Sequence, residues 1–263
     1  MKAIAALLAF LFLKTGEKFA TQEAAGPTVA EFTACVAKAV GDVRFEPGVF
    51  NRPADAVEFC GAKKPAVGIV TPGFYLAYHR ALNMEPLLEV RRQGVPAERY
   101  VVAAMKTAPD GLDALQGKVL ATALADEERF VVGVILQDKV KEVRLKAVGD
   151  VEGAAFDLVE GAKGAADAVL MEEAMWEVIR KDEELGPKLK AVFRSEELPR
   201  ALVVVFRDNA GKLDFAKLRC ILSRLHESAE GRRVMDEIRV EAFEPLNGSR
   251  LKKAQELFLG KCE

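Results

Sequence analysis

The sequence predicts an α/β fold in which mostly parallel sheets are flanked by helices. Short apolar runs, typical of strands, alternate with helical patterns along the whole chain. Several runs, such as residues 66–70 and 201–206, are apolar throughout, and continuous runs indicate strands buried on both faces. The length of 263 residues fits one large domain or two medium lobes, and no internal repeat or low-complexity tract is evident.

The first apolar run, residues 3–13, has two interpretations. Together with Met1-Lys2 it resembles the start of a secretory signal. The segment that follows offers no small-x-small cleavage site, because Lys18 and Glu23 stand where a small residue is needed. We therefore favour a buried first strand and keep a signal within residues 1–25 as the alternative. The run is too short to span a bilayer as a helix.

The next elements follow from spacing and from helix breakers. Between Pro27 and Gly41, apolar residues recur at three- and four-residue spacing, which predicts a helix that starts at the proline and stops at the glycine. The other predicted strands are short apolar runs at residues 43–45, 66–70, 87–91, 100–105, 119–123, 143–145, 167–171, 189–193 and 201–206. The other predicted helices span residues 53–60, 74–82, 127–136, 153–159, 172–181 and 213–263, the last with a pause at 243–245.

The charge balance argues against a nucleic-acid partner. Lys and Arg together number 38 and Asp and Glu 40, which gives a net charge of −2. Nucleic-acid binders show a basic surplus with clustered Lys and Arg. The longest basic cluster here, Lys252-Lys253, lies in a late helical pattern that acidic residues otherwise balance. We interpret it as a solvated face.

The four cysteines are Cys35, Cys60, Cys220 and Cys262. They form no CxxC pair and no Cys/His group with metal-ligand spacing, so we expect no metal site. Their even number and wide spread suit two disulfides in an oxidising compartment. Cys35 with Cys60 and Cys220 with Cys262 is the simplest pairing, although four cysteines allow three connectivities. Buried free thiols are an equal alternative.

Four segments, taken in order, carry a resemblance to a known family. They are residues 68–75 (GIVTPGFY), 112–121 (LDALQGKVLA), 164–170 (GAADAVL) and 195–199 (SEELP). In this order and spacing they resemble the phosphonate/phosphate-type substrate-binding proteins of ABC importers, which have the type II periplasmic-binding-protein fold. Residues 3–50, as first strand, first helix and second strand, extend the resemblance over nearly the whole chain.

The resemblance implies two α/β lobes joined by two crossing strands as a hinge, with a ligand in the cleft between the lobes. The crossings fall near residues 100–105 and 202–206. Lobe one is then residues 1–99 plus 204–263, and lobe two is residues 100–203. A ligand that contacts both lobes favours the closed state by its differential affinity.

The same resemblance implies a solute-binding protein of the periplasm or another extracytoplasmic compartment, which captures a small molecule for an ABC permease or a sensor kinase. We expect a monomer with no cofactor and no enzymatic activity. The sequence contains no GxSxG, P-loop or GxGxxG motif. His79 and His226, the two histidines, lie in helical patterns where a surface role is expected.

Ligands in this architecture meet the carboxyl ends of strands and the amino ends of helices. The loop after the first strand offers the hydroxyl of Thr15, the ammonium of Lys18 and the ring of Phe19. We expect these three residues to contact the ligand, and a surface loop without function is the alternative.

Two further strand ends supply candidate ligand contacts. Thr71 is expected to cap the following helix, with Phe74 and Tyr75 as walls of the pocket, although two core aromatics are the plainer interpretation. Met171 and Glu172 end a later strand, and Glu172 is expected to face the ligand.

The turn at residues 125–130 departs from the family. In the phosphonate-binding relatives this turn carries Ser and Thr residues whose hydroxyls, with backbone N–H groups, hold the anion. Here Asp126, Glu127 and Glu128 stand in their place. Carboxylates favour the amino end of a helix, so a role as caps alone is one interpretation. They also repel a phosphonate dianion where screening is poor, which predicts a cationic or neutral ligand.

Two other functions remain open from the sequence. The first is an enzyme on the same scaffold, in which a carboxylate pair such as Glu127 and Glu172 does acid–base chemistry. The second is a degenerate binding protein that acts through protein partners.

Overall fold

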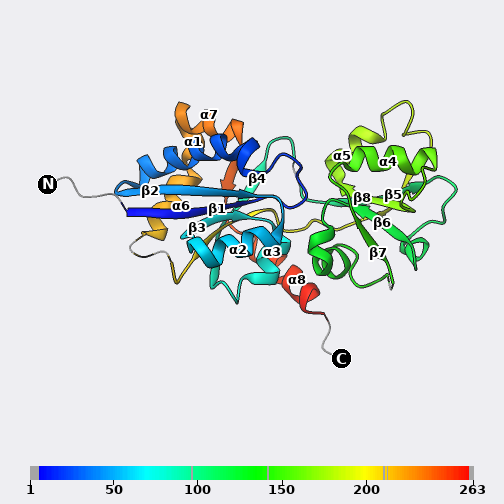
Figure 1. Cartoon of the computed structure of the whole chain (residues 1–263), viewed down its shortest axis with the longest axis horizontal. Helices are drawn as coiled ribbons and strands as arrows, with labels where there is room; N and C mark the ends of the chain where they lie inside the picture. Colours follow the sequence, from blue (N-terminus) through cyan, green and yellow to red (C-terminus); the bar gives the residue numbers. More distant parts are fainter. Residues whose placement is uncertain (1–5, 96, 141, 210, 212, 261–263) are drawn as a thin grey trace. The chain divides into compact units, whose positions relative to one another are not determined.

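The computed structural model describes residues 6–95, 97–140, 142–209, 211 and 213–260. The chain forms two compact units, each built on its own sheet (Figure 1). Unit 1 comprises the described residues within 1–15, 19–96 and 200–248. Unit 2 comprises those within 16–18, 97–199 and 249–263. Two sheets with helices confirm the predicted α/β class.

The sheet of unit 1 has six strands in the order β11-β4-β10-β3-β1-β2. Strands β2, β1 and β3 are parallel neighbours, whereas β10 pairs antiparallel with both β3 and β4, and β11 pairs antiparallel with β4. The strands are β1 (Ala6–Leu13), β2 (Val43–Phe50), β3 (Val67–Val70), β4 (Met84–Arg92), β10 (Leu202–Phe206) and β11 (Val240–Glu244).

The first apolar run confirms the strand prediction, because β1 lies inside this sheet between β2 and β3. Its side chains alternate between the two faces, as the period of two requires. Phe10 joins the core on one face, while the neighbouring Leu11 faces the other side and lies against Gly68 of β3. Both side chains are almost completely buried.

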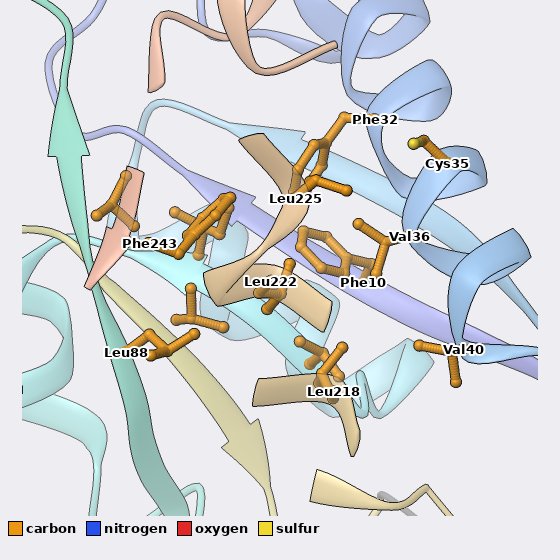
Figure 2. Packing of buried hydrophobic residues seen from close by; sticks show 14 of the residues in the cluster. Phe10, Phe32, Cys35, Val36, Val40, Leu88, Leu218, Leu222, Leu225 and Phe243 are labelled. Carbon is orange, nitrogen blue, oxygen red and sulfur yellow. The ribbon is translucent and has the colours of Figure 1, made fainter. Parts of the chain in front are cut away.

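Helices cover both faces of the unit 1 sheet (Figure 1). One face carries α1 (Gln22–Val40), α6 (Phe215–Ser223), the short helix η4 (Leu225–Glu227) and α7 (Ala229–Glu237), and the other carries α2 (Pro53–Lys63) and α3 (Pro72–Tyr78). Figure 2 shows the first of these interfaces. Phe32 of α1 packs with Phe10 and Phe243 at ring-centroid distances of 6.3 and 5.9 Å. Leu218 and Leu222 of α6 close the same cluster.

The sheet of unit 2 has five strands in the order β7-β6-β8-β5-β9. Strand β6 is parallel to β7 and β8, and β5 is antiparallel to β8 and β9. The strands are β5 (Tyr100–Met105), β6 (Val119–Thr122), β7 (Arg144–Ala147), β8 (Ala168–Glu172) and β9 (Leu189–Arg194).

The helices of unit 2 are short and pack on small side chains. They are η1 (Leu112–Leu115), η2 (Ala125–Glu127), the π-helix η3 (Phe130–Ile135), α4 (Val151–Glu160), α5 (Glu173–Ile179) and α8 (Gly248–Leu259), of which the residues from Ser249 onward belong to this unit. The core under α4 and α5 contains five alanines besides Trp176, namely Ala103, Ala121, Ala154, Ala155 and Ala166. Alanine is therefore the commonest residue in this core.

Several element boundaries differ from the sequence predictions. Helix α1 begins at Gln22, capped by the hydroxyl of Thr21, so Pro27 lies inside the helix and not at its start. Strand β2 continues through Pro47 to Phe50, beyond the predicted end at residue 45. The stretch predicted as one helix at 127–136 is a 3₁₀ turn followed by a π-helix.

The prediction of helix from residue 213 to the end is wrong at residues 240–244. These residues form β11, an edge strand on β4, because Val240, Ala242 and Phe243 are buried in the core of unit 1. A register shift between Val240 and Ala242 leaves the consecutive residues Ala242 and Phe243 both buried, which breaks the alternation typical of a strand.

The chain passes between the units just before β5, where unit 2 resumes at residue 97, and just before β10, at residues 199–200, as well as at 15–16, 18–19 and 248–249. Strands β5 and β10 are the two strands that the resemblance marked as crossings, and each lies wholly within one sheet. Residues 249–260, which were expected in lobe one, group with unit 2. Side-chain contacts of α8 with unit 2, described below, give the physical reason.

The predicted pairing of Cys35 with Cys60 is wrong. Both are buried free thiols, and Cys220 is an exposed one. Cys35 lies on α1 and Cys60 on α2, which cover opposite faces of the sheet (Figure 1), so the sheet separates them by more than a disulfide can span. Cys262 lies outside the described residues. None of the helices in the described ranges is both long and apolar enough to span a membrane.

Candidate functional site

In unit 1, two threonines meet at the carboxyl ends of neighbouring parallel strands. Thr15 follows β1 and Thr71 follows β3, and their hydroxyl oxygens lie 3.4 Å apart. Thr71 also caps α3, since its hydroxyl accepts a hydrogen bond from the Phe74 N–H at 3.4 Å. Thr15 is buried and Thr71 is half-buried. The structure thus brings together two hydroxyls that the sequence placed in separate loops, as strand order requires.

The aromatic pair behind Thr71 belongs to the interior. Phe74 has no exposed surface and packs against Tyr78 with ring centroids 4.9 Å apart. Tyr75 is buried and stacks on His79, and burial, with the Glu85 carboxylate adding to it, raises the pKa of the Tyr75 hydroxyl. Glu85 pairs in register with Val205, at the end of the sheet opposite to Thr71. The plainer interpretation of these two aromatics fits the structure better than a pocket wall.

The loop after β1 contributes residues to both units. Gly16 to Lys18 belong to unit 2, whereas Phe19 belongs to unit 1 and is 67% exposed. Gly16 has a φ of +75°, and a Cβ on it would lie 2.1 Å from the carbonyl oxygen of Ala123. Only glycine therefore allows this approach to the turn that follows β6. Lys18 is exposed.

The acidic turn, defined here as Asp126, Glu127 and Glu128, follows β6 in unit 2. Asp126 and Glu127 lie in η2, and the Glu127 N–H donates to the Leu124 carbonyl at 2.8 Å. Asp126 and Glu128 are exposed, whereas Glu127 is only 7% exposed. A carboxylate at this depth keeps its charge only with favourable partners, so a cationic group beside it would be favoured over an anionic one.

One polar residue at this strand end was missed by the sequence analysis. Thr122, the last residue of β6, is 1% exposed, and its hydroxyl accepts a hydrogen bond from the Leu124 N–H at 3.2 Å. It shapes the start of the turn beneath the carboxylates. The sequence contained a signal for Thr122. It is the one hydroxyl residue in the run Val119–Thr122 and ends that run. Strand ends position ligand groups in this architecture.

Met171 and Glu172, at the end of β8, differ in burial. Met171 is 2% exposed and packs in the core of unit 2. Glu172 is half-buried, precedes the first helical residue of α5, and pairs in register with Tyr100 of β5. Of this pair only Glu172 has a side chain at the surface.

A cavity of about 320 Å³ lies elsewhere in unit 2, between α4 and the strands β6 and β7. It is lined by Ala121, Lys146, Val148, Gly149, Asp150, Gly153, Ala154, Asp157, Ala165 and Ala166. None of the residues predicted from the sequence lines it. We therefore build the candidate site on the strand ends and not on this cavity.

Known proteins resemble this chain at the level of a protein family and of the fold. Residues 20–251 match the model of a family described as the ABC transporter, phosphonate, periplasmic substrate-binding protein. A comparison with curated protein sequences gives no match.

Three similar solved structures share the fold at low sequence identity. XAC2383 from Xanthomonas citri bound to ATP has a TM-score of 0.71 and 15% identity over 97% of this chain and 96% of that one. A binding protein component of an ABC phosphonate transporter from Pseudomonas aeruginosa has a TM-score of 0.67 and 14% identity, over 97% and 86%. PhnD1 from Prochlorococcus marinus in complex with methylphosphonate has a TM-score of 0.66 and 13% identity, over 96% and 97%.

Proposed function

Because the chain belongs to the family of periplasmic substrate-binding proteins of phosphonate ABC transporters, we propose that it captures a small molecule that is not a simple phosphonate. Membership implies a small-molecule ligand, a permease partner and an extracytoplasmic location. The proposal adds that the ligand carries a cationic or neutral group where it meets the acidic turn, and that the protein acts without catalysis. Delivery to an ABC permease is the leading role, and presentation to a sensor kinase is the alternative.

The observation that carries the proposal is the acidic turn. Three successive carboxylates follow β6, and the middle one, Glu127, is buried. Two like unit charges 4 Å apart repel each other by about 4 kcal/mol at an effective dielectric constant of about 20. A phosphonate dianion at this turn would meet that repulsion more than once. An ammonium or guanidinium group would be attracted by a similar amount.

The threonine pair of unit 1 can bind a ligand through either a hydrogen-bond donor or a hydrogen-bond acceptor of that ligand. A hydroxyl both donates and accepts, so Thr15 and Thr71 can bind an oxygen or an N–H group equally well. Their side chains carry no charge and set no preference for anions over cations. In this proposal unit 1 therefore contributes polar contacts, and the charge selectivity comes from the acidic turn of unit 2.

The proposal is tested by identifying a co-purified ligand. Native mass spectrometry of the purified protein is expected to show a bound small molecule with a basic or neutral group, and calorimetry then measures its affinity for the wild type and two variants. Glu127→Gln is expected to weaken binding at least about tenfold, since a charge-assisted hydrogen bond contributes roughly 1.5–3 kcal/mol. Glu128→Gln, at the exposed neighbour, should have a smaller effect.

Glu152→Gln is the matched control, because Glu152 is an exposed acid in the first turn of α4, another helix of unit 2. It should leave the affinity unchanged. Equal affinities of the wild type, Glu127→Gln and Glu128→Gln would contradict the role of the acidic turn. Turnover of the bound molecule would contradict a binding protein.

A further inference from the structure

The C-terminal helix α8 is fixed to unit 2 by Arg129, the residue that directly follows the acidic turn. Its guanidinium donates to the carbonyl oxygens of Phe258 and Leu257, at 2.6 and 2.9 Å. These carbonyls lie in the last turn of α8, where the regular ladder of helical hydrogen bonds ends, and the Leu257 carbonyl also accepts a hydrogen bond from the Gly260 N–H at 3.2 Å. A cation at this end also complements the helix dipole.

The same guanidinium makes a bidentate pair with Asp138 at the far end of η3. The two N–H···O distances are 2.6 and 3.0 Å. Two parallel bonds to a carboxylate fix the plane of the guanidinium as well as its position. With two carbonyls and one carboxylate bound, Arg129 has one well-defined orientation.

Gly133 provides the space for this arrangement. It lies one turn after Arg129 in η3, and a Cβ at this position would lie 2.6 Å from the central carbon of the guanidinium. The Arg129 side chain therefore runs directly across the glycine. A larger residue at 133 would push the guanidinium away from α8 or from Asp138.

The first turns of α8 are held at a different place in unit 2. Arg250 pairs with Glu197 at 2.8 Å, and Lys253 pairs with Glu196 and lowers the pKa of that carboxyl. Both glutamates precede the point at residues 199–200 where the chain leaves unit 2. Leu251 and Ala254 are buried along the helix. Twelve helical residues extend about 18 Å, so α8 connects this departing segment with Arg129.

We propose that α8 is a brace for the acidic turn, and that Arg129 is the positioning residue through which it acts. The backbone of Arg129 is pinned by its side chain, and the carboxylate of Glu128 is attached one residue earlier. Fixing residue 129 therefore restricts the conformations that residues 125–128 can adopt. That this matters for ligand capture rests on the function proposed above for the turn, whereas the brace itself does not.

Hydrogen exchange of the full chain without added ligand tests the brace. In Arg129→Met, the amides of residues 256–259 are expected to exchange at least about tenfold faster than in the wild type, because charge-assisted hydrogen bonds are lost. The amides of residues 125–129 should accelerate by a similar factor. Arg194→Met is the control, since Arg194 is an arginine of similar exposure paired with Glu173 in the same unit, and it should change neither segment.

Two further variants separate positioning from general loss of structure. Glu197→Gln should accelerate exchange in residues 250–254 and leave the acidic turn unchanged. Gly133→Ala keeps every polar group but displaces the guanidinium, so it should reproduce Arg129→Met, and the double variant should show no further increase. This non-additivity is a readout that independent destabilisation does not give.

Faster exchange in α8 with an unchanged acidic turn would overturn the proposal, and so would unchanged exchange in both segments or additive effects in the double variant. Failure of the brace leaves the ligand class untouched, because no ligand takes part in the experiment. Conversely, a phosphonate ligand would contradict the proposed function without affecting the exchange result.

Discussion

Both units have polar groups at the ends of strands, but the units differ in the composition of their cores and in the charge of these groups. Unit 1 has a core rich in aromatic and long aliphatic side chains, and it offers the neutral hydroxyls of Thr15 and Thr71. Unit 2 has a core rich in alanine, and it offers carboxylates that are held by an ion-paired helix. The contrast indicates that the stability of unit 1 comes from packing. The electrostatics of unit 2 would set the ligand class.

The largest expected effect tests the packing of unit 1. Phe32→Ala removes a ring that is 1% exposed and touches both Phe10 and Phe243. It should lower the free energy of unfolding by about 3–5 kcal/mol, because the aromatic cluster cannot collapse into the cavity. Denaturant unfolding measures this. Phe19→Ala is the control at a 67% exposed ring, and a loss as large as that of Phe32→Ala would contradict the assignment of the core.

The next prediction tests the alanine-rich core of unit 2. Ala155 has no exposed surface, so Ala155→Leu must displace its neighbours and should cost about 1–3 kcal/mol. Ala174→Leu makes the same chemical change at an exposed position of α5 and should stay within about 0.5 kcal/mol of the wild type. If thermal unfolding shows no difference between the two variants, unit 2 is not packed as tightly as unit 1.

A smaller effect is expected at the loop that approaches the acidic turn. Gly16 and Gly41 both have a φ of +75°, so an alanine at either position carries backbone strain of about 1 kcal/mol or more. Only Gly16→Ala also places a methyl group against the Ala123 carbonyl, whereas nothing lies within 4 Å of Gly41. Gly16→Ala should therefore be the more destabilising of the two in denaturant unfolding. Equal losses would show that the loop does not contact the turn.

The last effect is visible only at alkaline pH and concerns the interior of unit 1. Burial raises the pKa of the Cys60 thiol from 9.0 to about 12. Between these values the unfolded chain loses the proton that the folded chain keeps, so stability should fall as the pH rises through this range. Cys60→Ala should remove that part of the pH dependence. At pH 8, alkylation should modify the exposed Cys220 first, and rapid modification of Cys60 without unfolding would contradict its burial.

The alternation of apolar runs and helical patterns was enough to predict the α/β class and most strands. It also gave β1, because a continuous apolar run without a cleavage site fits a buried strand. Three features were not predicted from the sequence, each for a physical reason. A register shift in β11 breaks its period of two, Pro27 is tolerated inside α1, and the position of α8 depends on side chains such as Arg129 that have no periodic signal.

The candidate site could likewise be predicted only in part. Strand ends could be predicted, because parallel strands bring their carboxyl ends to one edge, and this placed Thr15 beside Thr71. Whether a side chain turns outward could not be predicted, so Phe74, Tyr75 and Met171 were proposed as ligand contacts although they are buried. Thr122 was missed although it is the hydroxyl that ends β6, because only the structure shows its hydrogen bond with the Leu124 N–H at the start of the turn.

The most direct measurement exchanges the acidic turn for the hydroxyls found in phosphonate-binding relatives. Calorimetric titration with methylphosphonate should show binding to Asp126→Ser/Glu127→Thr/Glu128→Ser that is at least about tenfold tighter than binding to the wild type. Wild-type protein that binds methylphosphonate as tightly as this variant would contradict a ligand class set by the carboxylates of unit 2.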